Sequence, residues 1–281
     1  MKIKVAKNIG FCWGVKRALS VAEELLARGG SVYMLGPLVH NERVVEDLKK
    51  KGAQVVDDLD KVPVGAVLLI RAHGVGPQLY REAQDKGLKI ADATCPKVLE
   101  IQEKARQLSD DKRTLVIIGD KGHQETKGIK AQISSGKVLV LKSVEDLKDK
   151  EDFLRDKRIG VVVQSTQSVE NAEKILGKLK KISYDTKSYD TICASTKKRQ
   201  KELRSIASGV DVMIVVGSHG SANTNRLYMI SRKENERTYL IEEAADLKES
   251  WLEAVASVGI ASGSSTPIEI IEEVVRRIKD A

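Results

Sequence analysis

Three cysteines are the residues of this chain best suited to chemistry. Cys12, Cys95 and Cys193 are the only cysteines among its 281 residues. An odd number at such wide spacing excludes a disulfide scaffold and favours a metal-binding or catalytic use. No CxxC or HxxxH pair is present, which argues against a structural zinc site. A papain-like nucleophile would use one thiol and leave two unexplained, and a single cysteine can also be a small buried apolar residue.

The cysteines also set the register of an internal repeat. Each is followed 24 residues later by a glycine at the end of an apolar run: Gly36, Gly119 and Gly217. Four residues past these glycines stand His40, His123 and Ser221, and two residues further stand Glu42, Glu125 and Asn223. Later in each repeat comes a small polar motif at a less regular offset: RAHG around His73, QST at Gln164–Thr166, and SGSST at Ser262–Thr266. We therefore predict three copies of a βαβ-type unit.

The repeat indicates what the three thiols do. Each cysteine directly precedes a helical run, where the helix dipole and unpaired N–H groups stabilise a thiolate. Ligands of parallel α/β sheets lie beyond the carboxyl ends of the strands, so three such units would direct three thiolates to one point. This arrangement favours an iron–sulfur cluster. Three thiolates would leave one iron of a [4Fe–4S] cluster without a protein ligand and open to substrate.

Polar residues near these strand ends indicate an anionic ligand. His40, His73 and His123 fall where the repeat predicts a cleft, whereas His219 is out of register. Five further residues add hydrogen-bond donors without a lysine cage: Ser221, Asn223, Ser264, Ser265 and Thr266. Such a set suits a phosphate or a diphosphate, although these serines and threonines are also ordinary turn and N-cap residues. The absence of a P-loop and of GxGxxG argues against a nucleotide site.

Short β-rich runs alternate with helical runs along the whole chain. The strands expected are 3–5, 32–35, 67–70, 115–118, 138–141, 159–163, 212–216 and 258–261, and the helices are 15–27, 42–50, 97–108, 172–181, 196–206 and 268–278. The charged stretch 142–158 is interpreted as a solvated helix and loop. We expect an α/β fold of three similar units with parallel sheets, 1–94, 95–192 and 193–281, around a pseudo-threefold axis with a central cluster.

Composition limits the partners. The formal net charge is +8 and hydrophobic residues make up 41% of the chain, which is typical of a globular protein with anionic partners. No apolar run approaches the roughly 20 residues of a membrane span, and no signal peptide is apparent, so we expect a cytoplasmic protein. The basic run KKRQK at Lys197–Lys201 has no interleaved aromatics, and we interpret it as an exposed helix face rather than a nucleic-acid site. A monomer is the default expectation.

Nine ordered motifs resemble those of a known family. GFCWGV, LVHNE, RAHGV, DATCP, GHQE, QST, DTIC, SANTNRL and SGSSTP follow the order and spacing seen in the 4-hydroxy-3-methylbut-2-enyl diphosphate reductases, which catalyse the last step of non-mevalonate isoprenoid synthesis. The resemblance covers essentially the whole chain. It implies that Cys12, Cys95 and Cys193 bind a [4Fe–4S] cluster and that Glu125 supplies a proton together with Thr166. It also implies that the diphosphate binds to His40, His73, His123, Ser221, Asn223 and Ser265.

The reaction implied by the resemblance is a reductive dehydroxylation that gives isopentenyl and dimethylallyl diphosphate. Two electrons would come one at a time from ferredoxin or flavodoxin. The chain departs from the family pattern at Gln124, where proline is expected, at Ala222, where serine is frequent, and at Ser165, where threonine is frequent. Two other classes stay open at this point: a hydratase with an open-iron cluster, and a non-enzymatic iron–sulfur or zinc protein that senses redox state.

Overall fold

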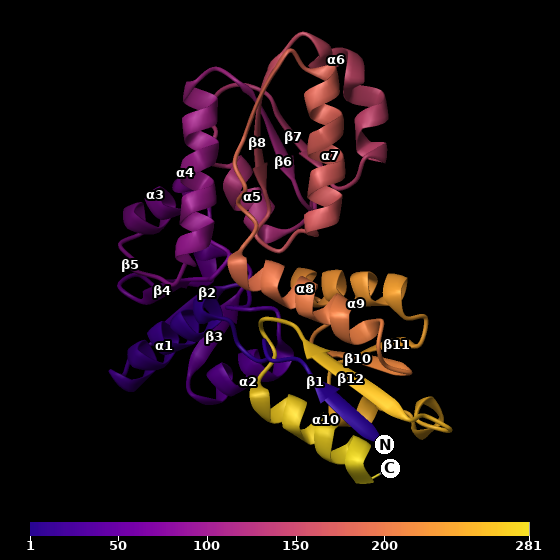
Figure 1. Cartoon of the computed structure of the whole chain (residues 1–281). Coiled ribbons are helices and arrows are strands. Elements are labelled where there is room, and N and C mark those ends of the chain that lie inside the picture. Colours follow the sequence, from indigo (N-terminus) through magenta and orange to yellow (C-terminus); the bar gives the residue numbers. More distant parts are fainter. Residues whose placement is uncertain (281) are drawn as a thin grey trace. The chain divides into compact units, whose positions relative to one another are not determined.

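The structure is a computed structural model that describes residues 1–280 (Figure 1). Within these residues the strands form three sheets, each of four parallel strands. One sheet has the order β1 (Lys2–Val5), β12 (Ser257–Ser262), β10 (Val212–Val216), β11 (Thr238–Ile241). The next has the order β3 (Ala53–Val56), β2 (Val32–Leu35), β4 (Val67–Ile70), β5 (Lys89–Asp92). The last has the order β7 (Val138–Leu141), β6 (Thr114–Ile118), β8 (Arg158–Val163), β9 (Asp185–Ser188). The predicted α/β class with parallel sheets is confirmed.

Helices connect these strands as parallel pairing requires. The helices are α1 (Trp13–Ala27), α2 (Glu42–Lys50), α3 (Pro77–Asp85), α4 (Pro96–Asp110), α5 (Gln124–Lys130), α6 (Glu151–Arg155), α7 (Val169–Ile182), α8 (Ala194–Ala207), α9 (Ala222–Glu234) and α10 (Ile268–Asp280). Short 3₁₀ turns are η1 (Leu59–Lys61), η2 (Glu145–Lys150), η3 (Ala244–Asp246) and η4 (Glu249–Trp251).

The three sheets share one topology, and in one of them the first strand of the chain takes an edge position. In two sheets the outer strand next to the second inner strand follows it in the chain, as β5 follows β4 and β9 follows β8. In the sheet that holds β10 and β12, the same place beside β12 is taken by β1 from the other end of the chain. The first predicted unit, 1–94, therefore lends its first strand to the sheet of the third.

The chain divides into two compact units. One comprises residues 1–16, 39–47 and the chain from Ala194 onward, and contains the sheet of β1, β10, β11 and β12. The other comprises Arg17–Leu38 and Leu48–Cys193, and contains the other two sheets. Three units bounded at residues 94 and 192 stay a prediction.

Apolar side chains cover both faces of the inner strands. Val212, Ile214 and Val216 of β10 pack with α10, while Met213 and Val215 of the same strand pack with α8 and α9. Figure 1 shows α10 on one side of this sheet and α8 and α9 on the other. Strand β6 does the same, with alternate residues facing α7 on one side and α4 and α5 on the other. Burial on both faces explains why the inner strands are continuous apolar runs.

The predicted strands correspond to observed ones within a residue or two, but four strands were missed. These are β3, β5, β9 and β11, and each lies at the edge of its sheet. Their sequences, such as KIAD and DTKS, mix polar and apolar residues because they are only partly buried. Helices α3, α5 and α9 were missed as well. The stretch 142–158 was wrongly interpreted as fully solvated, since Leu147 and Leu154 are buried in the core and Arg158 opens β8.

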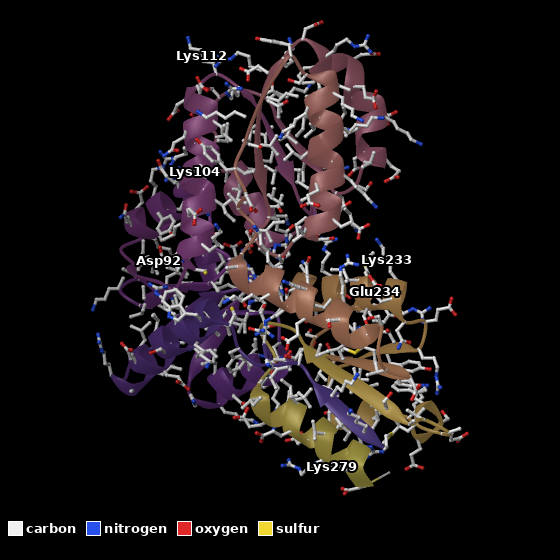
Figure 2. All side chains as sticks on the ribbon, in the orientation of Figure 1. Asp92, Lys104, Lys112, Lys233, Glu234 and Lys279 are labelled. Atoms are coloured by element: carbon white, nitrogen blue, oxygen red, sulfur yellow. The ribbon has the colours of Figure 1, made fainter. Side chains whose placement is uncertain are left out.

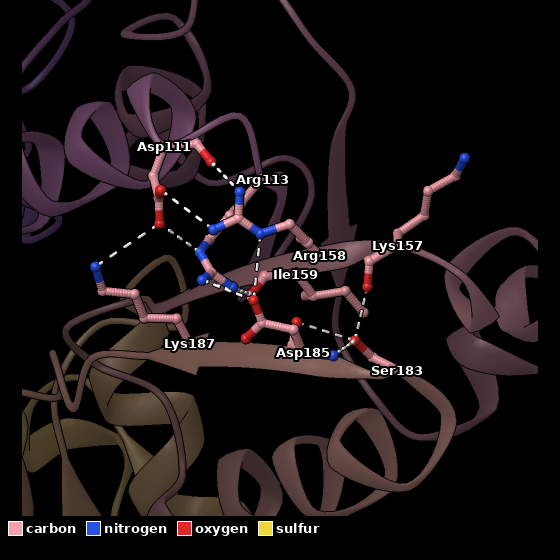
Figure 3. Close-up of polar contacts among 8 residues, drawn as sticks. All are labelled: Asp111, Arg113, Lys157, Arg158, Ile159, Ser183, Asp185 and Lys187. Atoms are coloured by element: carbon pink, nitrogen blue, oxygen red, sulfur yellow. Dashed lines mark hydrogen bonds and ion pairs between the residues drawn. The ribbon is translucent and has the colours of Figure 1, made fainter.

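An ion-pair network joins the amino ends of β6, β8 and β9 (Figure 3). Arg113 lies 2.7 Å from Asp111 and 2.9 Å from Asp185, and Arg158 contacts both carboxylates. The hydrogen bond from Arg113 holds the pKa of Asp185 below its usual value. The network lies at the edge opposite the polar strand-end loops, so we assign it a structural role. Other charged groups, such as Lys112, Lys233 and Lys279, are exposed (Figure 2).

Candidate functional site

Each cysteine occupies the same place in its sheet. The backbone N–H groups of Cys12, Cys95 and Cys193 donate to the carbonyl oxygens of Ser264, Ala72 and Ser165, each at 3.0 Å. Each acceptor is the second residue past an inner strand: β12, β4 or β8. A helix begins on the residue after each cysteine, at Trp13, Pro96 and Ala194. All three cysteines are half-buried thiols outside any disulfide. The repeat predicted from their spacing is therefore present in the backbone.

The glycines of the repeat also match. The N–H groups of Gly36, Gly119 and Gly217 donate to the last residue of the neighbouring edge strand: Val56, Leu141 and Ile241, at 2.8, 2.9 and 2.8 Å. Four residues later, His123 and Ser221 are the N-caps of α5 and α9. His40 is one residue out of step, because Asn41 instead accepts a hydrogen bond from Val44 N–H at the start of α2.

The less regular third motif becomes regular in the structure. His73, Thr166 and Ser265 each follow the residue whose carbonyl accepts the cysteine N–H. All three are therefore the third residue past an inner strand. In the sequence their offsets from the cysteines differ because the intervening helices α2, α5 and α9 have 9, 7 and 13 residues and the loops also vary, whereas the edge strands β3, β7 and β11 have four residues each.

Glu125 is buried and held by one neighbour. It is the second residue of α5 and only 1% exposed. Its Oε1 accepts from the Ser165 N–H at 2.6 Å, and its Oε2 accepts from the Ser165 hydroxyl at 2.7 Å. Burial raises the pKa of Glu125, and the two bonds from Ser165 oppose that rise. Since Ser165 also accepts the Cys193 N–H, one residue links the carboxyl group to a cysteine loop.

Thr166, predicted to work with Glu125, forms its hydrogen bond with a different residue. Its hydroxyl accepts from the Gln164 side-chain amide at 3.1 Å, and the Gln164 carbonyl oxygen accepts from Asp120 N–H at 2.8 Å. The residue that contacts the Glu125 carboxyl is Ser165, which sequence reasoning noted only as a departure from the family pattern. The sequence signal that could have identified Ser165 was its position between Gln164 and Thr166 in the QST motif.

Two predicted histidines lie together. The rings of His73 and His123 are 5.2 Å apart, edge to face. His123 Nδ1 accepts from Glu125 N–H at 3.1 Å, so a neutral ring carries its proton on Nε2. The loops are also joined by Arg71, whose guanidinium donates to Gln124 at 2.8 Å. Glutamine at this unusual position thus gives a partly buried arginine its partner, and burial lowers the pKa of Arg71.

The compact unit that contains β10 and β12 holds a buried side-chain amide without a hydrogen-bond partner among residues 1–280. Asn223, the second residue of α9, is 3% exposed, and within residues 1–280 neither its side-chain nitrogen nor its oxygen has a hydrogen-bond partner. Buried amides are rarely left unpaired, because desolvation is costly. Nearby in the chain, the Ser221 hydroxyl accepts from Thr224 N–H at 3.3 Å. In the same unit the Ser265 hydroxyl donates to the His40 carbonyl at 3.2 Å. The Asn223 amide therefore keeps its hydrogen-bonding groups unsatisfied by residues 1–280.

Fold and site together define a class: an α/β protein of three matching parallel sheets, each with one thiol before a helix and polar loops at its carboxyl edge. A family model described as LytB protein matches residues 3–279. A 4-hydroxy-3-methylbut-2-enyl diphosphate reductase of Geobacter sp. strain M21 is 39% identical over 278 residues, 99% of this chain and 97% of that protein. The Aquifex aeolicus enzyme of that name is 39% identical, with 99% and 96% covered. The chain belongs to the LytB family.

Solved structures agree. One titled as (E)-4-hydroxy-3-methyl-but-2-enyl diphosphate reductase, the terminal enzyme of the non-mevalonate pathway, is 38% identical with a TM-score of 0.71 and full coverage of both chains. A Plasmodium falciparum diphosphate reductase is 31% identical with a TM-score of 0.92, covering 98% of this chain and 87% of that one. None of the helices within residues 1–280 is both long and apolar enough to cross a bilayer.

Proposed function

We propose that this chain reduces (E)-4-hydroxy-3-methylbut-2-enyl diphosphate to isopentenyl and dimethylallyl diphosphate. Curated relatives that match nearly the whole length of the chain are named for this activity. The observation that carries the proposal most directly is the Glu125 carboxyl group, which is buried, raised in pKa and linked to Cys193 through Ser165. Removal of a hydroxyl group as water needs such a proton donor.

Cys12, Cys95 and Cys193 would hold a [4Fe–4S] cluster. The donor set fits, because all three are half-buried thiols outside any disulfide, and each directly precedes the first turn of a helix. When bound, such a cluster supplies electrons and, with only three protein ligands, an open coordination position.

The diphosphate would be bound by neutral or weakly basic donors rather than lysines. Asn223 offers a buried amide that lacks a partner within residues 1–280. In a neutral His123 ring the proton is on Nε2, since Nδ1 accepts from the Glu125 backbone N–H. The remaining ligands implied by the resemblance each stand in a strand-end loop: His40, His73, Ser221 and Ser265.

Glu125 would deliver the proton. A carboxylic acid donates usefully near neutral pH only if its pKa is raised, and burial provides that shift here. Ser165 orients both carboxyl oxygens, and Thr166 occupies the next position in the same loop. Overall, the substrate gains two electrons and two protons, its C–O bond breaks, and water leaves. A ferredoxin or flavodoxin donor, a monomeric state and a cytoplasmic location stay predictions from the sequence.

Anaerobic purification followed by iron and sulfide analysis tests the proposal. We expect a brown protein with about four irons per chain. It should convert the allylic diphosphate only when a reductant is present. Serine at any one of Cys12, Cys95 or Cys193 should abolish turnover and destabilise the cluster. Product formation without a reductant would favour a hydratase instead. One tightly bound zinc after reconstitution with iron and sulfide would rule the cluster out.

A further inference from the structure

Helix α8 separates its basic run into an inner and an outer face. Within KKRQK, Arg199 is 5% exposed and faces inward. Its guanidinium donates to the Ser262 carbonyl at 3.0 Å and to the Gly10 carbonyl at 2.7 Å. Gly10 lies two residues before Cys12. The helix is therefore fixed against the loop that carries Cys12, and the expectation that the whole run is exposed is wrong at Arg199.

A second contact fixes the same loop one turn along α8. The Glu202 carboxylate accepts from the backbone N–H groups of Lys7 and Asn8, at 2.5 and 3.0 Å, and from the Asn8 side chain. Arg199 and Glu202 are three residues apart and so share one side of the helix. The negatively charged Glu202 carboxylate is thus already hydrogen-bonded to the segment that leads to Cys12.

The outer side of α8 and the loop beside it carry positive charge. Lys198 and Lys201, also three residues apart, are exposed, as are Lys7 and Lys16. Within residues 1–280 none of these four lysines forms a salt bridge, and only Lys7 lies close enough to the Glu202 carboxylate to attract its charge. Trp13, the residue after Cys12, is 66% exposed. Below, these five residues are called the Cys12 surface.

We infer that the Cys12 surface docks an acidic protein that carries one electron at a time; this inference rests on the proposed function. Two such encounters, each oxidising one carrier by one electron, would supply the two electrons that one substrate needs. Unpaired lysines steer an acidic partner and speed its encounter. An exposed tryptophan is a typical anchor at the centre of an interface. The partner would then lie beside one of the three proposed cluster ligands.

Charge complementarity favours this occupant over a second copy of the chain. A symmetric dimer through this surface would oppose its four lysines to the same four lysines of the other copy, which costs free energy. The acidic carrier neutralises them instead, and its binding weakens as salt rises.

The test compares two double variants with the same change in charge. K198E/K201E alters the Cys12 surface, and K180E/K181E alters two exposed lysines of α7 as a control. Turnover is measured with dithionite and, separately, with reduced ferredoxin and reduced flavodoxin, both acidic. For the carrier that supports wild-type turnover, we expect K198E/K201E to lower kcat/KM about tenfold at low salt. The loss should shrink at high salt, with dithionite turnover and the cluster spectrum unchanged.

Several outcomes would overturn the docking site. Equal losses in both variants would show a general charge effect. Turnover with dithionite but with neither carrier would remove this partner while leaving the proposed function intact. Loss of duplex DNA binding in K198E/K201E without a loss of carrier-driven turnover would assign the surface to nucleic acid. Absence of turnover with dithionite as well would refute the proposed function itself.

Discussion

Helices α5 and α9 begin alike, yet the residues at their second positions are held differently. Glu125 has both carboxyl oxygens bonded to Ser165, whereas the Asn223 amide has no hydrogen-bond partner within residues 1–280. Both side chains are almost fully buried. Under the proposed function, the same backbone position would serve two purposes. Beside β6 the protein itself orients the proposed proton donor, and beside β10 a polar group stays available for the proposed diphosphate.

The adjoining strand-end loops differ as well. Past β8 the loop holds Gln164. Its side-chain oxygen, Oε1, accepts from Asp120 N–H and lies 3.4 Å from the Thr126 hydroxyl. The corresponding residue past β12 is Gly263, which has no side chain to offer. A Cβ atom there would lie 2.0 Å from the hydroxyl oxygen of Thr224, the counterpart of Thr126, so the close packing of α9 requires glycine. The polar contacts of one loop are therefore absent from the other.

The largest effect is expected for Glu125→Gln. Glutamine keeps the shape and can still bond to Ser165, but it cannot donate the proton. We expect turnover to fall roughly a hundredfold or more, within the usual range for general acids, while iron content and pyrophosphate affinity stay the same. Steady-state kinetics with dithionite and calorimetry with pyrophosphate measure the two quantities. Near wild-type turnover would exclude Glu125 as the acid.

A smaller effect, on binding, is expected for Asn223→Ala. If the buried amide bonds to the diphosphate, its removal costs about 1.5–3 kcal/mol, the range for hydrogen bonds to charged groups, or about tenfold or more in affinity. Calorimetric titration with pyrophosphate provides the measurement. Asn171→Ala on α7 is the control, because the Asn171 side-chain amide already has a protein partner, the Lys142 carbonyl oxygen at 2.8 Å. Unchanged affinity in Asn223→Ala would remove this residue from the site.

The smallest effect is expected for Ser165→Ala, which removes one of the two bonds to Glu125. That bond lowers the pKa of Glu125, so its loss should raise the pKa further. Because the protonated acid is the active form, the alkaline limb of the pH–kcat profile should move to higher pH, with a several-fold lower maximum. Ser168→Ala, which removes the N-cap of α7, serves as the control for stability. A limb that stays in place would separate Ser165 from the proton donor.

Protein stability offers a second readout of the same variant. The folded pKa of Glu125 lies above its unfolded value, so its contribution to stability is fully present below the unfolded pKa. That contribution is lost as pH rises through the folded pKa. In Ser165→Ala this loss should extend to higher pH than in the wild type. Denaturant unfolding across a pH series measures it.

The sequence alone determined the repeat, the buried inner strands and the proposed chemistry of the site. Inner strands such as β6 and β10 are buried on both faces, and continuous apolar runs are visible without a structure. The 24-residue interval from cysteine to glycine is equally visible, because it depends on one helix and one strand of nearly constant length. The sequence was therefore sufficient for features that depend on a single helix or strand, or on two that are adjacent in the chain.

Tertiary structure alone decided the features that depend on pairing between distant segments. The edge strands β5 and β9 are recognisable only once their neighbours are known, since partial burial leaves a mixed sequence. Strand β1 was predicted as a strand, but its pairing with β12, across the length of the chain, was not. Ser165 and Glu125 lie 40 residues apart, and only the pairing of β6 with β8 brings their loops together. The sequence therefore predicted Glu125 as the proposed proton donor, whereas its partner, Ser165, was decided by the pairing of the strands.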